Sequence, residues 1–320
     1  MTTSGTYSFL VTRDDVIKTS MQFLGKLGEN ELPTATETSD LSCLLNMQTK
    51  QWMGKSDFAP GLKVFTRRRG YLFLNTLSGQ YSVGPSSATG WTNNFVNPTT
   101  TASAAGAQPA IVVNSVVGVV IGYNIGVAYG PLRTLFWTTV LNVVGSTVTL
   151  NANLPGPVVS GAEVYCYQTA GTQPQELETA VLRDGSNQDT PLNIMRSIQE
   201  YDSLPNKADP TNIADPVAIY YEFQLGTSNL FTDCGAANDT SKYIVVTYME
   251  PTQDFNNPLD NPSYPQEWFL PLCWGLAKNA HSAFQVSWTA GMESAYKEAL
   301  AIAQHKDPEE TVAYFQCGNE

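Results

Sequence analysis

Apolar residues recur at helical spacing near both ends of the chain and alternate in short runs between them. At the N-terminal end, Thr12 stands where a capping hydroxyl belongs, and Val16, Ile17, Met21, Leu24 and Leu27 form an apolar stripe after it. A second stripe follows at Leu41, Leu44, Leu45 and Trp52, and its helix is predicted to open at Thr36 or Thr38 and to end at Gly54. The spacing predicts two antiparallel helices.

The C-terminal end carries the same helical period. One helix is predicted over 268–284, with Pro271 either in its first turn or kinking it. The most regular stripe of the chain predicts the next helix, at Met292, Ala295, Tyr296, Ala299, Leu300 and Ala303. The run Asp307-Pro308-Glu309-Glu310 reads as a capping box and predicts a last short helix.

Runs of period two, bounded by Gly, Pro or Asn, predict strands in the middle of the chain. In one block they cover 110–113, 124–128, 134–142, 147–150 and 163–167, with Gly145-Ser146 as a two-residue hairpin turn. Turn signals about every ten residues indicate a small sandwich or barrel. Outside the block, strands are predicted at 62–66, 71–75, 80–83, 217–225 and 242–249, and a short helix at 191–201.

These patterns predict an α+β protein with discontinuous domains. Residues 1–84 and 170–320 are expected to form a helical-bundle body, in which the N- and C-terminal helices pack together, with a β-hairpin near 217–249. Residues 85–169 are expected to form an inserted β-rich module, a small β-sandwich or barrel. A chain of 320 residues is long enough for two such domains.

Charge changes the picture of what the surface does. The formal net charge is −12, only 14% of residues are charged, and 11% are aromatic. Such an acidic chain is a poor candidate for a surface that neutralises nucleic-acid phosphates. Low charge with many aromatic residues favours subunit contacts, because interface cores lose Lys and Glu and gain Tyr and Trp. No apolar run reaches the length of a membrane span, and the N-terminus lacks the pattern of a signal peptide, so we expect a soluble protein made in the cytoplasm.

No pattern in the chain predicts catalysis, a cofactor or a metal. Phosphate-cradling loops and a G-x-S-x-G elbow are absent from the sequence, and the two histidines, His281 and His305, lie 24 positions apart. The carboxylate pairs Glu176 with Glu178 and Asp254 with Asp260 are expected to be solvated. Five cysteines without C-x-x-C spacing are expected to be buried reduced thiols. The prediction is a protein that is not an enzyme.

Seven residues are candidates for an interface with a partner. The chain's basic cluster, Arg67-Arg68-Arg69, can meet an acidic partner or a phosphate backbone, or it can simply be exposed beside a turn. Trp268 and Trp274 can anchor a subunit contact, although core packing is the preferred reading. Tyr314 and Phe315 near the C-terminus complete the set.

The two ends together resemble a known family. The N-terminal segments are Arg13-Asp14-Asp15-Val16-Ile17, Leu24-Gly25-Lys26-Leu27-Gly28 and Leu41-Ser42-Cys43-Leu44-Leu45-Asn46-Met47 to Trp52. The C-terminal ones are Asn261-Pro262-Ser263-Tyr264-Pro265-Gln266-Glu267-Trp268, Leu276-Ala277 and the Ala-rich helix from Met292 to Ala303. In this order they resemble the head-to-tail adaptor (connector) proteins of short-tailed bacteriophages, of the packaged-DNA stabilisation and tail tubular A type. The patterns cover about a third of the chain.

The resemblance implies a structural virion protein of the neck or tail. Such adaptors form a ring below the portal protein, usually of twelve subunits, which helps to retain packaged DNA and conducts it at ejection. The helical body would pack around the ring, the extreme C-terminus would reach toward the portal, and other surfaces would receive the tail nozzle or tail fibre proteins. Twelve copies would carry 12 × −12 = −144 charges, so DNA would pass an acidic lumen without sequence-specific contact.

Two other functions stay open. A tail accessory protein whose β-module binds host glycan or tail fibres is one, because aromatic side chains can stack on sugars. An enzyme that cleaves cell walls is the other, although no acid–base pair can be recognised for it.

Overall fold

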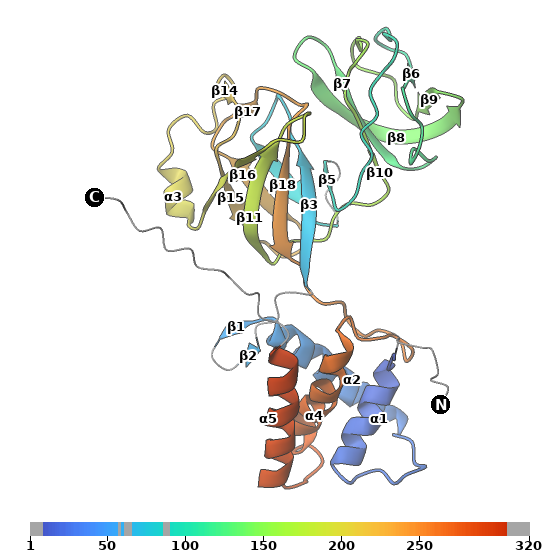
Figure 1. Cartoon of the computed structure of the whole chain (residues 1–320), viewed down its shortest axis with the longest axis vertical. Coiled ribbons are helices and arrows are strands. Elements are labelled where there is room, and N and C mark those ends of the chain that lie inside the picture. The colour runs from blue at the N-terminus through green and yellow to red at the C-terminus, as the bar shows by residue number, and fades with distance from the viewer. Residues whose placement is uncertain (1–8, 57–58, 61–65, 86–89, 306–320) are drawn as a thin grey trace, which may run out of the picture. The chain divides into compact units, whose positions relative to one another are not determined.

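The chain folds into two units that are each continuous in space. The computed structural model describes residues 9–56, 59–60, 66–85 and 90–305. One unit joins residues 1–66 to 251–320, and the other comprises residues 67–250 (Figure 1). The first is dominated by helices and the second by strands, so the chain is of mixed α and β structure and compatible with the α+β class. The strand predicted at 62–66, apart from Thr66, and the helix predicted from Asp307 lie outside the described residues.

Both ends of the chain supply the helices of the first unit, which we call the helical unit. They are α1 (Arg13–Phe23), α2 (Ala35–Trp52), α4 (Phe269–Ala280) and α5 (Ala290–Gln304), with a single 3₁₀ turn, η1 (Gln266–Trp268), leading into α4. The two-residue strands β1 (Lys55–Ser56) and β2 (Ala59–Pro60) pair antiparallel after α2.

Capping boxes fix where α1 and α2 begin. The Thr12 hydroxyl accepts a hydrogen bond from the Asp15 amide at 3.2 Å, and the Asp15 carboxylate accepts one from the Thr12 amide at 3.0 Å. Thr34 and Glu37 repeat this arrangement, so α2 begins earlier than the predicted Thr36 or Thr38. Pro271 lies in the first turn of α4. Amides in the first turn have no carbonyl partner within the helix, so the missing amide proton of proline costs no helical hydrogen bond.

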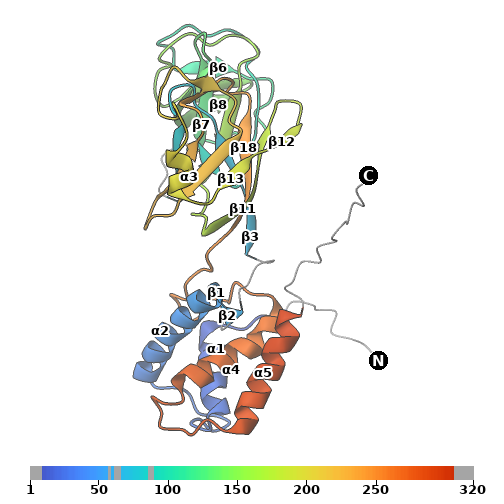
Figure 2. The ribbon, with the colours of Figure 1, turned by 90° about the vertical axis from the view of Figure 1, so that its left-hand side faces the viewer.

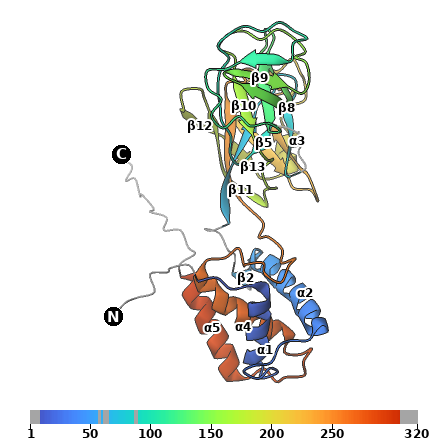
Figure 3. The ribbon, with the colours of Figure 1, turned by 90° about the vertical axis from the view of Figure 1, so that its right-hand side faces the viewer.

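Helix α4 is the centre of the helical unit, because it contacts α1, α2 and α5 (Figures 2 and 3). Its buried face is apolar over almost its whole length, and Leu272 and Leu276 are fully enclosed. Two buried polar side chains link distant parts of the sequence here. The Ser20 hydroxyl donates to the Cys273 carbonyl at 2.9 Å, and the Gln48 amide donates to the Leu272 carbonyl at 3.2 Å. The expected contact between the chain's two ends is therefore made.

Glu293 fastens α5 to α4. Its carboxylate accepts from Lys278 of α4 at 2.8 Å and from the Trp288 indole at 2.9 Å. The hydrogen bond from Lys278, followed by that from Trp288, lowers the pKa of Glu293 from 4.5 to about 2.

Lowering the pH should reduce the stability of the helical unit because Glu293 becomes protonated. Because its pKa is lower in the folded than in the unfolded chain, its contribution is present above about pH 4.5 and is lost as the pH falls toward 2. We therefore expect Glu293→Gln to lower the thermal midpoint of the helical unit at pH 7 and to have almost no effect near pH 2. Thermal melts followed by circular dichroism at both pH values measure this. The exposed Glu298→Gln on the same helix is the control, and an equal effect of Glu293→Gln at both pH values would contradict the prediction.

The second unit, which we call the strand unit, is built on three larger sheets. The first has the order β12 (Asp189–Pro191), β11 (Glu176–Arg183), β18 (Tyr243–Met249), β3 (Arg67–Phe73), β5 (Trp91–Thr92). The second runs β13 (Asn193–Met195), β15 (Ala218–Glu222), β16 (Ser228–Thr232), β4 (Gln80–Val83). The third runs β10 (Val164–Tyr167), β7 (Asn124–Tyr129), β8 (Thr134–Val144), β9 (Thr147–Leu150), β6 (Ala110–Val112). Short strands β14 (Ile213–Ala214) and β17 (Ala236–Ala237) pair parallel, and α3 covers Ile198–Asp202.

The first sheet is buried on both faces, which explains where the chain divides. On β3, Leu72 enters a core shared with the second sheet, and Phe73 enters a core shared with the third. On β18, Ile244 and Val245 alternate in the same way. Strands β3 and β18 thus belong with the strands around them. The division falls at residues 66 and 250 rather than at the predicted 84 and 169.

The β-hairpin predicted near 217–249 is wrong in its pairing. Strand β15 turns back through β16, whereas β18 lies in the other sheet between β11 and β3. The alternation of residues 243–249 marks a strand but cannot choose its neighbours. The helix predicted at 191–201 is also shorter than expected, because residues 193–195 pair with β15 and only Ile198–Asp202 are helical.

The third sheet is joined edge to edge by the segment 96–101. The two edge strands of this sheet are β10 and β6. Val96 forms a β-bridge with Cys166 of β10, and Thr100 forms one with Val113, the residue after β6, so one segment contacts both edges. The Gly145-Ser146 turn between β8 and β9 is confirmed, with Gly145 at a φ of 60°. Residues 85–169 contain two charged side chains, Arg133 and Glu163, and these pair with each other at 2.7 Å.

Candidate functional site

The arginine cluster lies at the start of β3 and is largely paired within the strand unit. Arg67 Nε lies 2.5 Å from a Glu178 carboxylate oxygen, and Glu178 sits where the register between β11 and β18 shifts. Arg68 Nε lies 2.7 Å from Glu250. Arg69 is exposed. Two of the three positive charges therefore already have a carboxylate partner, which weakens the cluster as a site for an acidic partner.

The two tryptophans of α4 and η1 take different places. Trp268 is 2% exposed and its ring lies 5.6 Å from that of Trp52, so its side chain fills the helical core and offers no anchor to a partner. This corrects its place among the interface candidates. Trp274 is half-buried and stacks on Phe23 at 4.1 Å, leaving part of its ring accessible. Tyr314 and Phe315 lie outside the described residues.

Other chemistry has little geometric support in the described part of the chain. No three His, Cys, Asp or Glu side chains there are grouped so that they could hold a metal ion. Cys166, Cys234 and Cys273 are buried, as expected, but Cys43 is exposed. Cys317 lies outside the described residues. Among the helices that the structure describes, none has the length and apolar character needed to cross a membrane.

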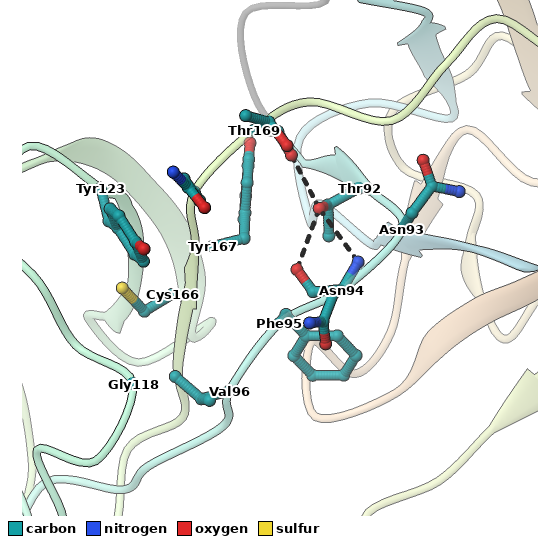
Figure 4. Close-up of a pocket in the computed structure, with 11 residues that line it drawn as sticks. Thr92, Asn93, Asn94, Phe95, Val96, Gly118, Tyr123, Cys166, Tyr167 and Thr169 are labelled. Carbon is teal, nitrogen blue, oxygen red and sulfur yellow. Dashed lines mark hydrogen bonds between the residues drawn. The ribbon is translucent and has the colours of Figure 1, made fainter. Parts of the chain in front are cut away.

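A cavity of about 420 Å³ opens in the strand unit between the segment 92–96, the loop 118–123 and the end of β10. Its lining is Thr92, Asn93, Asn94, Phe95, Val96, Gly118, Tyr123, Cys166, Tyr167, Gln168 and Thr169. Figure 4 shows Tyr123 and the Cys166 thiol on one side of the space and Thr92, Asn94 and Phe95 on the other. Its volume lies within the roughly 300–1,000 Å³ of small-molecule sites.

A hydrogen-bonded frame fixes the walls of this cavity. The Thr92 hydroxyl donates to the Thr169 carbonyl at 2.8 Å and accepts from the Asn94 amide at 3.3 Å (Figure 4). The Asn93 side chain donates to the Arg69 carbonyl at 2.7 Å and accepts from the Thr172 amide at 3.2 Å. Below them, Val96 and Cys166 exchange backbone hydrogen bonds of 2.9 Å in both directions.

The cavity is electrically neutral. None of its eleven lining residues is Asp, Glu, Lys, Arg or His. Burial raises the pKa of the Cys166 thiol to about 11 and raises that of the Tyr167 hydroxyl, so both groups are protonated at neutral pH. A protonated buried thiol is a weak nucleophile. The site can therefore bind through hydrogen bonds and ring faces, but it has no group poised for acid–base or nucleophilic work.

Sequence reasoning did not find this cavity. Its lining comes from three segments that each carry ordinary residues, and no spacing links Asn94 to Tyr123 or Gln168. A usable signal was the absence of charge from the block together with amide-rich runs such as Asn93-Asn94, but that signal does not locate a site.

Comparison with known proteins assigns no family. No protein-family model matches the sequence, and no curated protein matches it. Among solved structures, the chain is similar to the tailspike protein gp49 from Pseudomonas phage LKA1, with 19% identity over 24% of this chain and 15% of that chain, at a TM-score of 0.21. A likeness of that extent supports no conclusion about either fold or function.

Proposed function

We propose that the protein is a structural, non-enzymatic component of a bacteriophage particle: a head-to-tail adaptor that forms a ring between the portal protein and the tail. In this proposal the helical unit is the helical-bundle body of the adaptor, and the strand unit with its sandwich- or barrel-like third sheet is carried on it. Packaged DNA passes through the lumen of the ring, which helps to retain it until ejection.

The observation that carries the proposal is the way the two chain ends fold together. Helices α1 and α2 pack on α4, and the bonds from Ser20 to Cys273 and from Gln48 to Leu272 tie the N-terminal helices to the C-terminal one. The same segments carry the resemblance to adaptor proteins. The excursion between them, residues 67–250, is one compact insertion.

Surface composition supports assembly into a ring. The loop between β6 and β7 exposes Val117 by 81% and Ile121 by 60%, and apolar tips of this kind are commonly covered when subunits or partners join. Heterologous contacts repeated around an axis close a ring, and many weak contacts add up around it. The partners in this proposal are further copies of the chain, the portal, the tail nozzle and tail fibre proteins.

Reconstitution with the portal protein of the same particle tests the proposal. Mass photometry and electron microscopy of the mixture should show a closed ring of copies, with twelve expected, seated on the portal. A chain comprising residues 67–250 alone, checked for folding by circular dichroism, is the control and should not bind, because it lacks the helical unit. Full-length protein that forms no ring with or without the portal would refute the adaptor function.

A further inference from the structure

We propose that the cavity between residues 92–96, 118–123 and 166–169 is a binding site for a neutral saccharide. The inference does not rest on the adaptor function. It follows from what the cavity walls offer to a ligand and from what they lack.

The lining excludes charged ligands as the preferred class. Phosphate, sulfate and carboxylate groups are held in proteins by Arg, Lys or clustered backbone amides, and the eleven lining residues include no basic side chain. Cations are excluded by the same reasoning, since no acidic side chain lines the space. The lining therefore favours an uncharged ligand.

Hydrogen-bonding groups dominate the lining, which argues against a purely apolar ligand. Seven of the eleven residues carry a hydroxyl or a carboxamide: Thr92, Asn93, Asn94, Tyr123, Tyr167, Gln168 and Thr169. Thr92, Asn93 and Tyr167 already make hydrogen bonds within the protein. An apolar molecule would cover the others without giving them partners, which costs about 1–3 kcal/mol for each group left unsatisfied. A polyhydroxylated ligand can satisfy them.

Three polar side chains at this site are not engaged by the protein itself. The Asn94 and Gln168 carboxamides and the Tyr123 hydroxyl make no side-chain hydrogen bond to another residue within the described ranges, in contrast to Thr92 and Asn93. Asn94 and Gln168 are exposed, so their amides are free to exchange water for a ligand. A carboxamide both donates and accepts, which suits adjacent sugar hydroxyls.

Aromatic rings supply the other half of saccharide chemistry. Phe95 and Tyr123 line the cavity from two different segments and are partly exposed, whereas Tyr167 is 2% exposed and packs in the core. Figure 4 shows Phe95 and Tyr123 on opposite sides of the space. The C–H face of a pyranose is apolar and packs on such rings, while its hydroxyls point outward to polar groups. The fixed hydrogen bonds of Thr92, Asn93 and Val96 hold these walls before any ligand arrives, which reduces the entropy lost on binding. The volume fits a mono- or disaccharide.

The test is saturation-transfer difference NMR of the full-length protein with a panel of neutral sugars: glucose, galactose, mannose, rhamnose, N-acetylglucosamine, N-acetylgalactosamine, maltose and cellobiose. We expect at least one to bind. We also expect Asn94→Ala to weaken that binding about tenfold, as the loss of a carboxamide that makes two hydrogen bonds would. Asn97→Ala, which changes an exposed asparagine of the same segment outside the cavity, should leave the affinity unchanged.

Three results would overturn the inference. The first is that no sugar of the panel binds, and the second is that glucuronic acid or sialic acid binds while all neutral sugars fail. The third is that Asn94→Ala, with an unchanged thermal midpoint, binds as well as the parent protein. Tyr123→Phe provides a second, milder variant if Asn94→Ala lowers the thermal midpoint. Because the protein is tested alone, a negative result here leaves the portal experiment unaffected, and the reverse also holds.

Discussion

Replacing Trp91 with Ala should lower the free energy of unfolding of the strand unit by about 3–5 kcal/mol, the loss expected when a large aromatic side chain is removed from a core. Trp91 is 0% exposed and lies in the core between the first two sheets. Its indole N–H donates to the Thr172 carbonyl at 3.0 Å. Gly70 and Gly171 lie against the Trp91 ring, and the absence of a side chain at these positions provides the space for it. A Cβ on Gly70 would lie 2.0 Å from one ring carbon, and a Cβ on Gly171 would lie 2.6 Å from the ring nitrogen.

Urea titration followed by circular dichroism and tryptophan fluorescence measures this loss. Gly70→Ala should act on the same transition, because its methyl group displaces the Trp91 ring. Gly185→Ala is the matched control: no atom lies within 4 Å of a Cβ placed there, so the transition should shift little. A loss below about 1 kcal/mol for Trp91→Ala would contradict the central place given to this residue.

Placing a carboxylate at Leu276 should unfold the helical unit. Leu276 is 0% exposed on α4 and lies in the core that α4 shares with α1 and α2. An unpaired charge in that position costs an amount comparable with the roughly 5–15 kcal/mol by which typical domains are stable. We therefore expect Leu276→Asp to abolish the cooperative melting of the helical unit, while the strand unit keeps its own transition.

Leu270 offers the control for this substitution. It lies on the same helix but is 51% exposed, so Leu270→Asp should melt nearly as the parent protein does. Thermal melts at a helix-sensitive wavelength, together with NMR spectra of the strand unit's amides, separate the two units. If Leu276→Asp also removed the strand transition, the two units would not fold independently.

Local signals predicted the helices well because their causes are local. Thr12 was expected to cap the first helix and does so, and the stripe from Met292 to Ala303 marks α5, which runs from Ala290 to Gln304. The start of α2 was placed too late because Thr34, the actual cap, stands beside other threonines that look equally suitable. Strands β4 and β9 were predicted with their observed bounds.

Strand partners and the cavity could not be predicted in the same way. β18 has no neighbour close in sequence: it pairs with β3, which precedes it by more than 170 residues, and with β11. The hairpin was expected because its two strands are close in sequence. Burial of β18 on both faces instead favours its central place in the first sheet. The cavity forms where three segments that are distant in sequence come together. The pattern of residues in one sequence does not show which distant segments become neighbours. The charge-free character of residues 85–169 was visible, but not that Arg133 and Glu163 pair with each other.

The way the chain enters and leaves the strand unit makes that unit exchangeable. Arg67 and Met249 are cross-strand neighbours at the ends of β3 and β18, so the insertion departs and returns at adjacent points. Closely spaced ends of this kind let a whole domain be excised, replaced or enlarged without stretching the host fold around it. In evolution, the strand unit of such a protein can therefore be replaced as a whole domain while the helical unit is conserved.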